Sequence, residues 1–126
     1  MEEVMISEFS VDVDSLSVDG SKQIDVVRVR GEIDIYTCAE LRKSLSAVIE
    51  NSADTFILNL ENVQYIDSTG LGTIAHSAQQ IQANSGQIYV ICTKPQIKKI
   101  FEVSGLLTKN LTLFESEDQI SVPVEN

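Results

Sequence analysis

Hydrophobic residues along the chain follow two different periods, and the shorter one predicts strands. Residues 25–30, DVVRVR, alternate with a period of two and place Val27 and Val29 on one side of a strand that we expect to end at Gly31. Later apolar runs are short and rich in β-branched residues, which is typical of strands buried in a parallel sheet. These runs are residues 55–60 (TFILNL), 87–92 (QIYVIC) and 111–114 (LTLF).

Between these runs, apolar residues recur every three or four positions, which predicts a helix after each of the first three core strands. Thr37 and Glu40 form a capping-box pattern at the start of the first helix. Residues 84–86 (NSG) stop the second helix, and the third has Pro95 in its first turn and Gly105 at its C-cap. The predicted buried positions are Leu41, Leu45, Val48 and Ile49, then Leu71, Ile74, Ala75, Ala78 and Ile81, then Ile97, Ile100 and Phe101.

This order of elements, β-α-β-α-β-α-β, predicts an α/β fold with a parallel or mixed sheet and helices packed against it. The length of 126 residues suits one domain. We expect residues 1–24 to add one or two edge strands to that domain and residues 25–115 to form its core. Residues 116–126 have little pattern, and we expect them to form a tail that frays.

The composition excludes several classes of function. A net charge of −10 argues against binding to nucleic acid or to an anionic membrane surface. One histidine and two distant cysteines, Cys38 and Cys92, are too few for a zinc site. No apolar run approaches the roughly 20 residues that span a bilayer. The N-terminus, MEEVMISEF, has acidic residues where a signal peptide needs basic ones, so we expect a reduced, cytoplasmic chain.

Ser68, in the stretch IDSTG, lies between a predicted strand and a predicted helix, where a hydrolase nucleophile could lie. A nucleophile elbow needs glycine two residues earlier, however, and position 66 is isoleucine. The single histidine, His76, lies about 12 Å further along the helix, too far to act as a base. We therefore interpret Ser68 as an N-cap, in a helix start whose free N–H groups would also favour a phosphate on its hydroxyl.

Two carboxylates are predicted to flank Ser68. Asp34 and Asp67 each follow a parallel strand, and the carboxyl ends of such strands meet at one edge of the sheet. A metal site or a general acid–base pair is disfavoured because the motif has neither a histidine nor a third carboxylate. Gly70 and Gly72 do not form a phosphate-binding loop, which needs a third glycine or a Walker lysine, so we expect them to permit a close approach to a neighbouring loop.

From about residue 25 to about residue 115, the chain resembles a STAS domain of the bacterial anti-sigma factor antagonist type. The stretches that carry the resemblance are GEIDIYTCAELRKSL, FILNLENVQYIDSTGLGTI and GQIYVICTKPQIKKIFEVSGL. The specific part is D-S-[ST]-G-[LI]-G at residues 67–72, with support from GE[IL]D at 31–34 and [FM]-x-[VL]-[ST]-G-[LI] at 101–106.

The resemblance implies a single STAS-type domain, with a mixed, mostly parallel sheet of four to five strands flanked by helices, that is not an enzyme and needs no cofactor. It also implies that the chain binds an anti-sigma factor that is a serine kinase, and so releases a sigma factor. The kinase would phosphorylate Ser68 and weaken the complex, and a PP2C-type phosphatase would restore the active form. Asp34 matches the aspartate beside that serine. The implied partner-binding residues are Asp34, Asp67, Ser68, Thr69, Gly70, Leu71 and Gly72.

An alternative stays open at this point. A STAS-type domain could instead serve a scaffold or a lipid-transport complex, with Ser68 acting only as a helix cap. The chain also differs from the family in two ways. Residues 1–24 are longer than in the shortest members, and Thr69 replaces a frequent serine and adds a second hydroxyl that could be modified.

Overall fold

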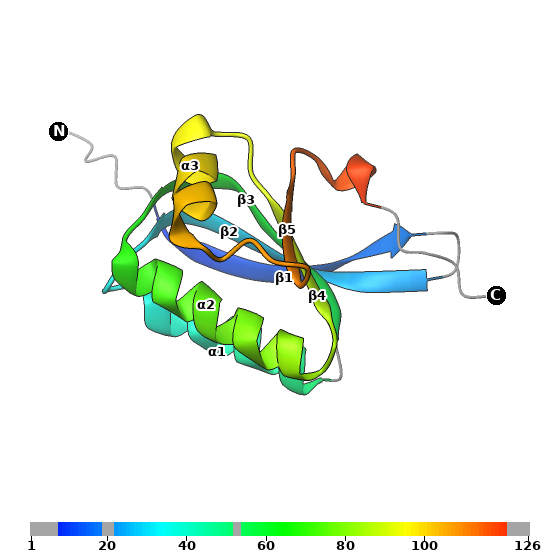
Figure 1. Cartoon of the computed structure of the whole chain (residues 1–126). Helices are drawn as coiled ribbons and strands as arrows, with labels where there is room; N and C mark the ends of the chain where they lie inside the picture. The colour runs from blue at the N-terminus through cyan, green and yellow to red at the C-terminus, as the bar shows by residue number, and fades with distance from the viewer. Residues whose placement is uncertain (1–7, 19–21, 52–53, 121–126) are drawn as a thin grey trace, which may run out of the picture.

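The computed structural model describes residues 8–18, 22–51 and 54–120, which form one mixed five-stranded sheet with three α-helices (Figure 1). The strand order follows the chain. β1 runs antiparallel to β2, and the other neighbours are parallel. The predicted α/β fold is confirmed, and the described part of residues 1–24 contains β1 and the start of β2. The strands are β1 (Ser10–Val18), β2 (Lys22–Ile33), β3 (Thr55–Ile66), β4 (Gln87–Ile91) and β5 (Leu111–Phe114).

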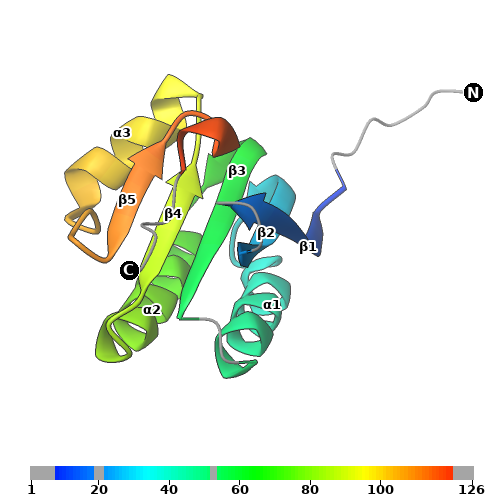
Figure 2. The same cartoon turned by 90° about the vertical axis from the view of Figure 1, so that its right-hand side faces the viewer.

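One helix follows each of the first three parallel strands: α1 (Cys38–Glu50), α2 (Ser68–Ala83) and α3 (Pro95–Ser104). Right-handed crossovers between strands that are adjacent in sequence place all the connecting helices on the same face of a sheet. Figure 2 shows α1 and α2 side by side along that face. Within the described residues, no helix is both long and apolar enough to cross a membrane.

The main core lies between this face and the helices. Val27 and Val29 of β2 pack there with Leu41 of α1, Ile74 of α2 and Phe101 of α3, and each of these side chains is at most 2% exposed. Because all three helices contribute to one cluster, the predicted stripes are confirmed as the packing surfaces of a single domain.

Two strands are longer than predicted. β2 does not end at Gly31 but continues to Ile33, because Gly31 adopts φ +101° at a shift in the β2–β3 register. β3 likewise continues to Ile66, which pairs with Ile33. The extra residues carry both strands to the same edge of the sheet, where β2 and β3 end in two adjacent loops.

The C-terminal turn η1 (Glu117–Gln119) packs against the opposite face of the sheet. The Arg28 guanidinium donates to the two carboxylate oxygens of Glu117 at 2.6 and 3.4 Å, and the Asn59 side-chain amide donates to Glu117 at 2.7 Å. Ile120 is 7% exposed and packs in a second cluster on this face. Residues 116–120 are therefore docked on the sheet rather than frayed, and residues 121–126 lie outside the described residues.

Neither cysteine is paired, and both are buried. Cys92 follows β4 in the main core, and its burial raises the pKa of the thiol to about 11. A thiol with so high a pKa is almost entirely protonated at neutral pH, which makes it a poor nucleophile and a poor metal ligand.

Replacement of Glu117 by alanine should lower the free energy of unfolding by about 1–2 kcal/mol, because it removes the acceptor of Arg28 and leaves one N–H of the buried Asn59 amide unpaired. Urea denaturation measures the change. Glu115→Ala is the matched control, since the ion pair of Glu115 with Lys98 (3.0 Å) is more exposed. It should cost at most about 0.5 kcal/mol. Equal losses in the two variants would contradict the docking role of Glu117.

Candidate functional site

The loops that follow β2 and β3 are joined by a direct backbone contact. The Asp67 amide donates to the Ile33 carbonyl oxygen at 3.0 Å. Gly70 also lies against Ile33: a Cβ atom at position 70 would be 2.5 Å from Ile33 Cγ2 and 2.8 Å from the Ile33 carbonyl oxygen. The prediction that the Asp34 and Asp67 segments share one edge of the sheet is confirmed, and so is the prediction that Gly70 permits a close approach.

Asp67, not Ser68, is the N-cap of α2. Its backbone is extended, and its carboxylate accepts a hydrogen bond from the Gly70 amide at 2.9 Å. Ser68 is the first helical residue, and its exposed hydroxyl makes no hydrogen bond to any residue that the structure describes. The prediction that Ser68 caps the helix is therefore wrong. Because Asp67 does the capping, the Ser68 hydroxyl faces solvent with its donor and acceptor sites unused.

Asp34 organises the loop before α1. Its carboxylate accepts from the amides of Tyr36 (2.9 Å) and Thr37 (3.1 Å). The Thr37 hydroxyl donates to the Glu32 carbonyl oxygen at 2.7 Å and makes no capping bond to the helix, so the predicted capping box with Glu40 is wrong. Asp34 already satisfies the free amides of this turn, which leaves the Thr37 side chain to fasten the loop to the end of β2.

Thr69 and Leu71 complete the predicted site. The Thr69 side chain is exposed, and its carbonyl oxygen accepts from the Thr73 hydroxyl at 3.2 Å. Leu71 is half-buried against the main core. The structure therefore brings together all seven residues that the sequence analysis assigned to partner binding, around the start of α2.

The arrangement offers an acceptor hydroxyl but no catalytic base. Both nearby carboxylates, Asp34 and Asp67, hold backbone amides of their own loops. His76 is exposed on α2. Across residues 8–18, 22–51 and 54–120, no group of three histidine, cysteine or acidic side chains could hold a metal ion.

A shallow groove of about 250 Å³ begins at Ser68 and crosses α2 to the end of α3. Gly72 lies in this groove, and a Cβ atom there would meet nothing within 4 Å. The prediction that Gly72 serves a close approach within the chain is therefore wrong; space beside it is open. The groove is lined by Ser68, Leu71, Gly72, Ala75, Ser104 and Leu106.

Exposed hydrophobic side chains flank the site on both sides, and the sequence analysis missed them. Ile35 (63% exposed) and Tyr36 (89%) follow Asp34. Val103 (70%) and Leu107 (38%) are neighbours in sequence of the groove residues at the end of α3. The pattern gave no signal, because Ile35 continues the period of two from Ile33 and Val103 lies three residues after Ile100, as buried positions would.

Comparison with known proteins identifies the family. The STAS domain model matches residues 15–120 of this chain. An anti-sigma-B factor antagonist of Staphylococcus aureus (strain NCTC 8325 / PS 47) is 36% identical over 80 residues, which are 64% of this chain and 74% of that protein. The protein of the same description from Staphylococcus epidermidis is 34% identical, with the same coverage.

Solved structures agree with this assignment. An anti-sigma factor antagonist from Mycobacterium paratuberculosis is 27% identical, with a TM-score of 0.70 over 86% of this chain and 89% of that one. The anti-sigma factor antagonist SpoIIAA in its unphosphorylated form has the same fold, with a TM-score of 0.66 over 87% of this chain and 92% of that one at 18% identity. The chain thus belongs to the STAS-domain family, and the relatives that it resembles are anti-sigma factor antagonists.

Proposed function

We propose that this chain is a cytoplasmic anti-sigma factor antagonist that binds an anti-sigma factor serine kinase and so releases a sigma factor. Phosphorylation of Ser68 switches the binding off, and a PP2C-type phosphatase restores it. The observation that carries the proposal is the Ser68 hydroxyl, which is exposed and unbonded at the start of α2, beside a groove with apolar walls. The names of the relatives support the same class of function.

The predicted partner-binding residues divide into two groups by what they contact. Three residues position the surface. Two of them accept hydrogen bonds from backbone amides within the chain, and the third is a glycine that allows two segments to pack closely. The others present groups that a partner can reach. The positioning residues are Asp34, Asp67 and Gly70, and the contacting residues are Ser68, Thr69, Leu71 and Gly72.

In this proposal the kinase supplies the base for phosphoryl transfer, since the two carboxylates described near Ser68, Asp34 and Asp67, already accept hydrogen bonds from backbone amides. The Ser68 oxygen would attack the γ-phosphorus of ATP held by the kinase, the bond to ADP would break, and the hydroxyl proton would pass to a kinase residue. The phosphatase would then hydrolyse the phosphate ester with water. Only Ser68 of this chain changes covalently.

The added phosphate acts on the complex rather than on the fold. It brings close to two negative charges at neutral pH to the N-terminal end of α2, where the helix dipole tolerates an anion. It also brings bulk into the middle of the proposed contact with the partner. Charge and bulk that have no matching site in a packed interface raise the dissociation rate.

The alternative reading, a domain of a scaffold or lipid-transport complex, explained Ser68 only as a helix cap. Asp67 performs that role, so this alternative no longer accounts for the serine. No other feature of the described residues favours it.

Ser68 variants test the switch. Incubation of the wild type with the candidate kinase and ATP should add one phosphoryl group, located at Ser68 by intact-mass and peptide mass spectrometry. Ser68→Asp should bind the kinase at least about tenfold more weakly, while Ser68→Ala should bind as the wild type does and stay bound when ATP is added. Thr69→Ala is the control, and it should still be phosphorylated. If all variants bind alike under kinase and ATP, the proposal fails.

The two glycines of the motif should separate stability from binding. Gly70→Ala should lower the free energy of unfolding by about 1–3 kcal/mol, because its Cβ atom would overlap the Ile33 backbone. Gly72→Ala should raise it by up to about 1 kcal/mol, because alanine favours the helix and the space is open. We expect the more stable Gly72→Ala to bind the kinase more weakly, since its methyl group enters the groove. Unchanged binding would exclude Gly72 from the contact.

A further inference from the structure

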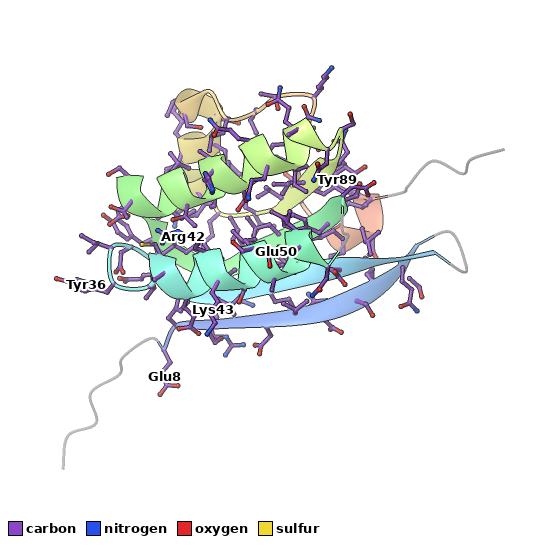
Figure 3. All side chains as sticks on the ribbon, turned by 90° about the horizontal axis from the view of Figure 1, so that it is seen from below. Glu8, Tyr36, Arg42, Lys43, Glu50 and Tyr89 are labelled. Carbon is purple, nitrogen blue, oxygen red and sulfur yellow. The ribbon has the colours of Figure 1, made fainter. Side chains whose placement is uncertain are left out.

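Ile35 and Tyr36 form an apolar tip at the end of the molecule that carries Ser68. Tyr36 is 89% exposed, more than any other large hydrophobic side chain of the described residues, and Ile35 is 63% exposed. Figure 3 shows Tyr36 projecting outward from the loop ahead of α1. Single exposed hydrophobic residues are common on protein surfaces and need no explanation. The tip indicates a binding surface only if its structural surroundings differ from those of other exposed hydrophobic residues.

The first difference is rigidity. The Tyr36 amide is bonded to the Asp34 carboxylate at 2.9 Å, and the loop is fastened to β2 through Thr37 and Glu32. The Asp34 carbonyl oxygen also accepts from the Cys38 amide at 2.9 Å, which starts the first turn of α1. A loop held in this way loses little conformational freedom when a partner covers it, so its apolar surface contributes to affinity with a small entropic cost.

The second difference is its connection to the Ser68 segment. Ile33 immediately precedes this loop, accepts from the Asp67 amide, and packs against Gly70. The apolar tip and Ser68 therefore lie on two segments that are joined at Ile33. A partner that contacts the serine lies beside the tip. Val13, which is 52% exposed on β1, pairs instead with Val27, six residues before Ile33.

The third difference is the charge around the tip. Glu32, Asp34 and Glu40 lie within four residues of the tip in sequence, whereas the nearest cations, Arg30 and Arg42, lie five and six residues away. The chain as a whole carries a net charge of −10. A partner surface complementary to this region has an apolar pocket bordered by lysine or arginine, and attraction between the two charges speeds association.

We propose that the apolar tip is the anchor that determines affinity for the kinase, by filling an apolar pocket bordered by basic residues on that partner. This inference rests on the proposed function and adds a separate role to it. Ser68 controls whether the complex persists after phosphorylation, and the tip sets how tightly the unphosphorylated chain binds. Buried aromatic residues dominate the binding energy of many protein interfaces, and Tyr36 is placed to act as one.

Titration of the purified kinase that phosphorylates Ser68 against unphosphorylated variants tests the anchor. Tyr36→Ala should weaken binding by about 10- to 100-fold, mainly through faster dissociation, whereas Tyr36→Phe should stay within about twofold of the wild type. Val13→Ser is the matched control for loss of an exposed hydrophobic side chain, and it should bind normally. Urea unfolding should show that all three variants are folded, because both positions are exposed.

The outcomes separate this inference from the function on which it rests. If Tyr36→Ala binds as tightly as the wild type while Ser68→Asp binds weakly, the anchor is excluded and the phosphorylation switch stands. If Tyr36→Ala and Val13→Ser weaken binding equally, the tip has no special role and the inference is overturned. If the wild-type chain neither binds the kinase nor accepts phosphate at Ser68, both proposals fall together.

Discussion

The hydrogen bond from the Asp67 amide to the Ile33 carbonyl oxygen is the contact on which the site depends. It joins the ends of two parallel strands at the point where each passes into a helix. The contact is possible only because residue 70 has no side chain, since a Cβ atom there would overlap Ile33. With these two segments joined, the start of α2 and the loop before α1 form one continuous surface.

Much of the fold could be predicted from local pattern. The two hydrophobic periods placed every core strand and helix, and Pro95 and Gly105 marked the ends of α3 correctly, with Gly105 in the left-handed conformation at φ +81°. Local chemistry also identified the Asp67–Gly72 segment as the start of a helix. These features depend on residues that are close in sequence, so the pattern of one sequence is enough to predict them.

Three features that the sequence did not predict have a different origin. Asp67 and Ser68 are both good N-cap residues, and the choice between them depends on the bond between Asp67 and Ile33 in another strand. The docking of the C-terminal turn depends on Glu117 reaching Arg28, 89 positions earlier in the chain. Exposure of Tyr36 likewise follows from how the loop is held, since its sequence alone does not show whether an aromatic residue is buried. Each of these three features depends on how separate segments are held together, which the local pattern does not show.

The identity of the cap also decides what kind of switch Ser68 can be. If the serine capped the helix, a phosphate on its hydroxyl would remove a bond that helps to start α2, and modification would act by loosening the fold. Because Asp67 supplies that bond, the hydroxyl can be modified while the cap, the Gly70 contact and the Ile33 junction all stay intact. Phosphorylation of this kind would change the surface that a partner contacts. The hydrogen bonds and packing that position this surface would stay as they are. The same junction at Ile33 also holds the loop with Ile35 and Tyr36, so in the proposed complex affinity and its control would change independently.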